Sequence, residues 1–141
     1  MTAEIEEYVR LVENVIRRYS GLEPGECYND EQQCWRFAKG SVDIYVMLLD
    51  IAGEPYVNFA TPIMAVPQSR REEFFERLLK ENAQRIAVKF SIREGVVWLE
   101  INREMRGLGF DEAMRSLVRV AEVADELDEV LVNEYGDTWD G

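Results

Sequence analysis

Residues 86–101 read IAVKFSIREGVVWLEI, and this stretch decides the fold class. Apolar residues alternate with polar ones up to Arg93, and they recur at every second position after Glu94–Gly95. A two-residue period is typical of strands that bury one face, and a glycine between two such runs is typical of a tight hairpin turn. The pattern therefore predicts an antiparallel hairpin. Its expected pairs are Ile92 with Val97, Phe90 with Leu99, Val88 with Ile101 and, on the opposite face, Lys89 with Glu100.

A second hairpin is expected upstream, because the same alternation flanks Lys39–Gly40. We predict strands over 34–39 and 41–49, joined by a two-residue loop. One face of this hairpin is then apolar, and the other carries a cross-strand pair of opposite charges. The expected pairs are Ala38 with Ser41, Phe37 with Val42, Arg36 with Asp43 and Trp35 with Ile44. A third strand is predicted from Tyr56 to Ala60, and Thr61–Pro62 is expected to loosen the chain after it.

The N-terminal segment has the three- and four-residue apolar spacing of a helix over 4–19. Thr2 is the expected N-cap, and Gly21 is the expected left-handed C-cap. Residues 23–30 contain Pro, Gly, Asn and Asp, so they are predicted to form a loop.

Two further helices complete the predicted fold. Ser69 and Glu72 have the spacing of a capping box, which would open a helix that runs to about Asn82. Asp111 can cap a last helix that runs to about Asn133. The order helix, three strands, helix, two strands, helix predicts an α+β fold with an antiparallel five-stranded sheet and three helices. We expect one domain over 1–135 and a frayed acidic tail over 136–141.

The formal net charge of −12 argues against binding to nucleic acid or to an anionic membrane surface, because the sequence shows no segregated basic patch. The chain has no histidine, which excludes Ser-His-Asp and Cys-His catalysis and histidine metal ligands. Cys27 and Cys34 are too few for a zinc site, so no metal or cofactor is expected. With no signal peptide and no apolar stretch long enough to span a membrane, we expect a cytoplasmic protein with reduced thiols.

Several segments resemble the YbjN-like family of bacterial proteins, which are described as sensory-transduction regulators. The resemblance spans about Trp35 to Tyr135. It is carried by the strand 42–46, the segment 55–59 with Pro62 and Pro67, the hairpin around Glu94–Gly95, and the run 121–128. It implies a fold similar to that of the small acidic chaperones of type III secretion. That fold implies a homodimer that holds an unfolded stretch of a client protein, and the family has no established catalytic residues to transfer.

One sheet face is a candidate partner-binding surface. Tyr45, Met47 and Leu49 point away from Val42 and Ile44, and Trp98 occupies the corresponding face of the second hairpin. If no helix covers them, their aromatic and sulfur-containing side chains provide adaptable contact area for a peptide. The alternative is that a helix of the same chain covers this face.

The last helix has an apolar arc that is wider than one sheet face can cover. Val120, Val123, Leu127 and Val130 are therefore candidate residues of a dimer interface, or they are covered by another helix of the same chain. From residue 120 to residue 141 there are eight acidic residues and no basic ones. These acids either keep the protein soluble or dock a basic client segment.

The function expected from the sequence is a non-catalytic protein-binding module, chaperone-like or a regulatory adaptor, that acts as a homodimer on a protein or peptide client. The alternative is a small-molecule-sensing regulatory domain, which needs a concave pocket with a few polar groups. A third class, an enzyme that uses carboxylates alone, would need Glu100, Glu104 and Asp111 to converge in a cleft, and nothing in the sequence indicates that they do.

Overall fold

Every neighbouring pair of strands in the sheet of this α+β chain is antiparallel. The computed structural model describes residues 2–136. The sheet has six strands in the order β1-β2-β3-β4-β6-β5. The strands are β1 Tyr28–Asn29, β2 Cys34–Lys39, β3 Val42–Ile51, β4 Glu54–Ala65, β5 Lys89–Arg93 and β6 Val96–Glu104. The helices are α1 Ala3–Ser20, α2 Pro24–Cys27, α3 Arg71–Gln84 and α4 Phe110–Tyr135. The predicted class is confirmed, and the predicted tail lies outside the described residues apart from Gly136.

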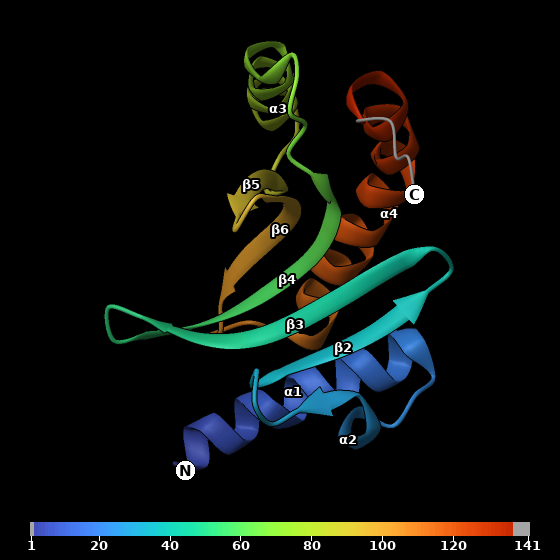
Figure 1. The fold of residues 1–141 in the computed structure, drawn as a ribbon. Helices are drawn as coiled ribbons and strands as arrows, with labels where there is room; N and C mark the ends of the chain where they lie inside the picture. The colour runs from blue at the N-terminus through green and yellow to red at the C-terminus, as the bar shows by residue number, and fades with distance from the viewer. Residues whose placement is uncertain (1, 137–141) are drawn as a thin grey trace.

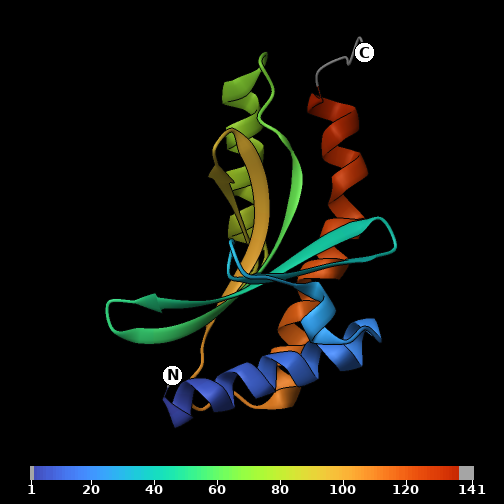
Figure 2. The ribbon, with the colours of Figure 1, turned by 60° about the horizontal axis from the view of Figure 1, so that its bottom comes forward.

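Helices pack on only one face of the sheet. Helix α4 crosses behind β3 and β4 in Figure 1 and packs on β3, β4 and β6. Helix α1 crosses the N-terminal part of α4, as Figure 2 shows, and α3 packs on β5. The face toward the viewer in Figure 1 carries no helix among the described residues. None of the described helices is long and apolar enough to cross a membrane.

The predicted loop over 23–30 is partly wrong, because it contains the short helix α2 and the two-residue strand β1. Pro24 opens this helix at a position where its missing N–H is not needed. Strand β1 then pairs with the start of β2, with Tyr28 opposite Trp35. These elements give four helices and six strands among the described residues, instead of three and five.

The first hairpin has the predicted faces but a register shifted by two residues. Lys39 pairs with Val42 and Phe37 pairs with Ile44, so Gly40 and Ser41 form the turn. Gly40 has a φ of 62°, which suits glycine as the first turn residue. A shift of two residues leaves each side chain on the same face, so the apolar alternation cannot detect it. Arg36 and Asp43 still share a face and form an ion pair of 3.2 Å.

The second hairpin forms as predicted around Glu94–Gly95, with Phe90 opposite Leu99 and Lys89 opposite Glu100. The strand begins only at Lys89, so the expected pairing of Val88 does not occur within the ladder, and Ile86 is 81% exposed. Strand β4 is longer than predicted. It continues past Pro62 because an irregularity in its pairing with β6 accommodates the proline.

The helix ends are partly as predicted. The side chain of Thr2 accepts a hydrogen bond from the Ile5 N–H at 3.2 Å, and Gly21 is the left-handed C-cap, so both caps of α1 are confirmed. The capping box at Ser69 is wrong, because α3 follows Arg70, whose φ of 53° breaks the chain direction first. Asp111 is not the cap of α4, since the helix already begins at Phe110 after Gly109.

Gly95 tests how strongly the second hairpin depends on its turn. Replacing it with alanine should lower the free energy of unfolding by about 1 to 2 kcal/mol, because its φ of 78° is costly for any residue with a Cβ. Gly25→Ala is the matched control, since Gly25 has no positive φ and an added Cβ meets no atom within 4 Å at either site. Urea denaturation of both variants measures the difference. Equal loss in the two would show that the turn conformation is not the cause.

Candidate protein-binding surfaces

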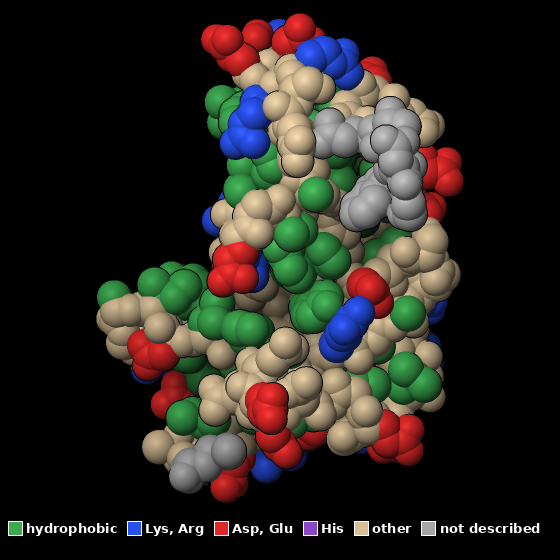
Figure 3. Space-filling model, viewed as in Figure 1, with side chains coloured by type: hydrophobic (Ala, Val, Ile, Leu, Met, Phe, Trp, Pro, Cys, Tyr) green, Lys and Arg blue, Asp and Glu red, His purple; other side chains and the backbone are tan. Residues whose placement is uncertain are grey.

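The helix-free face of the sheet contains the four residues predicted to contact a partner. Tyr45, Met47, Leu49 and Trp98 all lie on this face and are half-buried. The rings of Tyr45 and Trp98 meet edge-to-face across β4, with centroids 5.1 Å apart. Figure 3 shows hydrophobic side chains gathered along the middle of this face, with charged side chains around them. The alternative that a helix of the same chain covers this face does not hold for the described residues.

Two arginines flank the aromatic pair. The guanidinium of Arg36 lies over the Tyr45 ring at 5.1 Å, and that of Arg93 lies over the Trp98 ring at 4.9 Å. Cation–π contacts of this kind hold long side chains against a ring without enclosing it. The helix-free face therefore presents aromatic area flanked by two arginines, which are also paired with Asp43 and Glu100.

A buried polar cluster lies beside Trp98 on the same face. Its centre is Glu100, whose carboxylate accepts hydrogen bonds of 2.6 Å from both Ser91 Oγ and the Arg93 guanidinium. The amide of Asn58 donates to the other carboxylate oxygen at 3.3 Å and to Asn102 at 2.8 Å. Burial alone would raise the pKa of Glu100, but the bonds from Ser91 and Arg93 outweigh it, and the pKa of Glu100 lies below its ordinary value.

The other carboxylates considered for catalysis do not join this cluster. Glu104 accepts a hydrogen bond from the Tyr56 hydroxyl at 3.3 Å, and Asp111 lies in the first turn of α4. Glu100 is held by a donor on each side, so the arrangement stabilises a carboxylate and does not prepare a proton donor. Among the described residues, no group of three or more acidic, cysteine or histidine side chains could hold a metal ion.

The predicted dimer interface on α4 is largely inside the core. Val120, Val123 and Leu127 are buried, and only Val130 is exposed, at 41%. The wide apolar arc has two neighbours in its own chain, the sheet and α1. The sequence showed the width of the arc but not the helix that fills its second side. A second copy can reach Val130 without opening the core, and it cannot reach the other three.

A groove between α1 and the β1–β2 edge was not expected from the sequence. It has a volume of about 640 Å³ and is open to solvent. Its apolar lining is Ile5, Val9, Tyr28, Trp35 and Leu48. The indole N–H of Trp35 is buried and has no hydrogen-bond partner among the described residues. Because a buried donor without an acceptor costs about 1 to 3 kcal/mol, this N–H is the most unusual polar atom of the groove.

A second apolar groove lies between α3 and β5 and has a volume of about 250 Å³. We call the three accessible apolar side chains on it, Phe75, Leu79 and Ile92, the edge patch. Leu79 is 68% exposed and Ile92 is 47% exposed. Leu78 and Phe90 form the buried floor beneath them. Helix α3 fully buries only Phe74 and Leu78, so Phe75 and Leu79 stay accessible.

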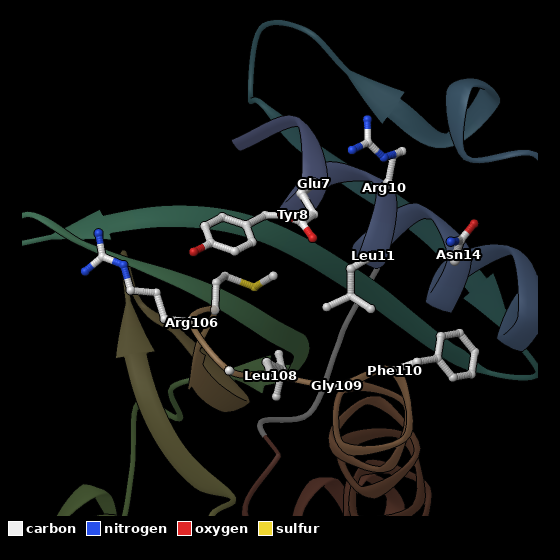
Figure 4. A pocket seen from close by; sticks show the side chains of 11 residues that line it. Glu7, Tyr8, Arg10, Leu11, Asn14, Arg106, Leu108, Gly109 and Phe110 are labelled. Carbon is white, nitrogen blue, oxygen red and sulfur yellow. The ribbon is translucent and has the colours of Figure 1, made fainter. Parts of the chain in front are cut away.

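Figure 4 shows a third hollow, of about 590 Å³, between α1 and the loop that precedes α4. Leu11, Leu108 and Phe110 give it an apolar side, and Arg106 closes one end. Arg106 also donates to Glu4 at 3.1 Å and to Glu54 at 2.6 Å, which ties α1 to the start of β4. The guanidinium that closes this hollow therefore already has two carboxylate partners.

Comparison with solved structures identifies the fold. A chain of the ExsC–ExsE complex superposes with a TM-score of 0.68 at 18% identity, covering 93% of this chain and 97% of that one. The Yersinia pestis type III secretion chaperone SycH, solved in complex with a fragment of YscM2, gives 0.60 at 12% identity over 85% and 98%. YbjN of E. coli, described as a transcription regulator, gives 0.62 at 15% identity over 89% and 91%.

The chain has the fold of type III secretion chaperones and YbjN. The fold expected from the sequence resemblance is therefore confirmed. No family model matches the sequence, and no curated protein matches it either. At these identities the likeness establishes the fold alone.

The Glu100 cluster predicts a specific dependence of stability on pH. Because the folded-state pKa of Glu100 is lowered, its contribution is complete above the ordinary value of 4.5 and is lost as pH falls through the lowered pKa. Glu100→Gln should lower the free energy of unfolding by about 1 to 2 kcal/mol near neutral pH. The difference between wild type and variant should shrink only below the ordinary value of 4.5, as pH falls through the lowered pKa. Urea titrations at several pH values measure it, and a difference that shrinks already above pH 4.5, or that never shrinks at any acid pH at which both proteins fold, would contradict the assignment.

Proposed function

We propose that this chain is a protein-binding module, chaperone-like or a regulatory adaptor, that acts as a homodimer on a client polypeptide. The observation that carries the proposal is the groove between α1 and β2, one of whose lining residues, Trp35, has a buried indole N–H without a hydrogen-bond partner among the described residues. The groove is open to solvent and mainly apolar, as a site for a polypeptide segment is, whereas a small-molecule sensor needs an enclosing pocket. The YscM2 fragment bound to the similar chaperone SycH supports a protein client.

The chemistry of the groove favours an extended client segment. Apolar client side chains would cover Ile5 and Val9, which α1 leaves accessible. A main-chain carbonyl of the client is the simplest acceptor for the Trp35 N–H. Tyr28 packs edge-to-face on Trp35 at 5.1 Å and is itself exposed, so a rotation of this ring would open the N–H to an incoming carbonyl.

The helix-free face is the second surface in this proposal. Tyr45, Met47, Leu49 and Trp98 would form a second contact for a client segment that passes around β3, since Leu48 of the groove and Leu49 of this face point to opposite sides of the same strand. Beside Trp98, both carboxylate oxygens of Glu100 accept hydrogen bonds from neighbouring side chains. A client can therefore make apolar contacts on this face without breaking the hydrogen bonds of the buried Glu100 carboxylate.

The edge patch is the surface proposed for dimerisation. Phe75, Leu79 and Ile92 lie on one groove at the end of the sheet, and exposed apolar groups that share a groove are typical of an interface. A twofold axis would place the same patch of the second copy against it, since an isologous interface uses one patch twice. We further propose a cytoplasmic location in a bacterium, since the similar structures from Yersinia pestis and E. coli support a bacterial origin, and a reducing compartment would keep Cys27 and Cys34 as free thiols.

Val9 tests the client groove. The purified chain should retain one or a few proteins from a lysate of the bacterium that encodes it, and the retained protein is then identified, purified and titrated. Val9→Glu should weaken this binding at least tenfold, because it places a charge on the apolar wall of the groove. Val132→Glu is the matched control, since Val132 is an exposed valine of α4 outside the groove. Equal affinity of the two variants would remove the groove from the proposal.

Leu79 tests the dimer. The wild-type chain should have twice the monomer mass by light scattering in dilute solution, and Leu79→Glu should reduce it to the monomer mass. Val130→Glu should leave the dimer intact, because Val130 lies on α4 outside the edge patch. The reverse result, in which only Val130→Glu dissociates the dimer, would show that the dimer interface lies on α4. A monomeric wild type would contradict the homodimer itself.

A further inference from the structure

Strand β5 ends the sheet, and its outer edge is partly occupied by a side chain. The N–H of Phe90 donates to Asn82 Oδ1 at 2.6 Å, and Asn82 Nδ2 donates to the Phe90 carbonyl at 3.3 Å. Asn82 belongs to α3, so this contact joins a helix to the edge of the sheet. A carboxamide has the same donor and acceptor as a peptide group. Asn82 therefore stands where a peptide group of an added strand would stand.

Main-chain N–H and C=O groups alternate in direction along an antiparallel strand, so the contact at Phe90 shows which other residues of β5 direct theirs to the outer edge. Because both main-chain groups of Phe90 point outward, those of Lys89, Ser91 and Arg93 point toward β6, and those of Ile92 point outward again. Ile92 also belongs to the edge patch. The edge therefore has two outward main-chain pairs, one taken by Asn82 and one next to exposed apolar surface.

A second copy of the chain is the strand that best fits this edge. If two β5 strands pair about a twofold axis through Ser91, Phe90 of each copy lies opposite Ile92 of the other, and all four residues have outward groups. The same register brings Lys89 near Arg93 of the other copy, but Arg93 is already neutralised by Glu100 at 2.6 Å. The apolar edge patch continues beside this edge on α3.

We propose that Asn82 is an intramolecular plug that prevents the β5 strand of a second copy from joining the sheet. The proposal rests on the homodimer proposed above and specifies its contact, because a plugged edge limits the two copies to side-chain packing through the edge patch. Unpaired edges are the usual route to uncontrolled strand addition, and proteins commonly block them. Asparagine is a poor helix former, so its position inside α3 has its reason in this contact and not in the helix.

A peptide of residues 87–95, acetylated and amidated at its ends and labelled with a fluorophore, serves as the second strand. Its binding is measured by fluorescence anisotropy against wild type, Asn82→Ala, Asn82→Asp and Gln84→Ala. Asn82→Ala should bind the peptide at least tenfold more tightly than wild type, and Asn82→Asp should lie between them because it keeps only the acceptor for the Phe90 N–H. Gln84→Ala, the control on the same helix, should match wild type. Equal affinity for wild type and Asn82→Ala would overturn the proposal.

Amide hydrogen exchange of Phe90 gives a second readout that does not depend on the peptide. Exchange at Phe90 should be at least tenfold faster in Asn82→Ala than in Gln84→Ala, and unchanged protection would overturn the plug. If circular dichroism shows that Asn82→Ala does not fold, the same comparison is made with Asn82→Asp, which has the size of asparagine. Both measurements are repeated in the Leu79→Glu background. There, Asn82→Ala is compared with Gln84→Ala in the same chain, so the result does not depend on whether Leu79→Glu dissociates the dimer. The plug and the homodimer can therefore fail independently.

Discussion

The burial of one stripe of α4 against a single face of the sheet is the contact on which the other features depend. The stripe consists of Leu117, Val120, Ala124, Leu127 and Leu131, all buried. Because α4 and α1 both pack on this face, the opposite face carries no helix from residues 2–136 and must be stable in contact with water or a partner. The chain meets this condition with the hydrogen-bonded cluster around Glu100 and the arginine-flanked pair of Tyr45 and Trp98.

The acidic end of α4 has a structural use besides solubility. Carboxylates near a helix C-terminus oppose the helix dipole, but Glu134 forms an ion pair with Arg77 of α3, and Glu126 forms one with Arg85, the C-cap residue of α3. Glu81 of α3 joins both arginines and completes a network between the two helices. Part of the strong negative charge of α4 is therefore matched by these two arginines, which the sequence alone shows only as scattered basic residues.

Much of the fold was predictable because it depends on local periodicity. The alternation around Glu94–Gly95 fixed both the faces and the register of one hairpin, since the turn residues and the apolar pattern agree. The hairpin at Gly40 shows the limit of this reasoning, because a two-residue shift preserves every face and only the turn conformation decides between the registers. Strand β1 was missed because two residues carry no period.

The candidate surfaces were less predictable, because they depend on which elements become neighbours. Tyr45 and Trp98 could be assigned to one sheet face by counting, and the structure brings them together. No pattern in the sequence indicated that the Trp35 N–H would lack an acceptor among the described residues, or that Asn82 would reach Phe90. Each of these depends on contacts between distant segments.

The arginine network between α3 and α4 has a consequence for local dynamics. Helix α3 packs on the sheet only along β5, and its arginines reach Glu126 and Glu134, which are largely exposed to water. Dissolved ions weaken exposed pairs of this kind far more than they weaken the apolar core around α4. Ionic strength therefore acts mainly on one end of the molecule. There it weakens the ionic hold of α4 on α3, while the apolar contacts of Phe74 and Leu78 keep α3 on the core.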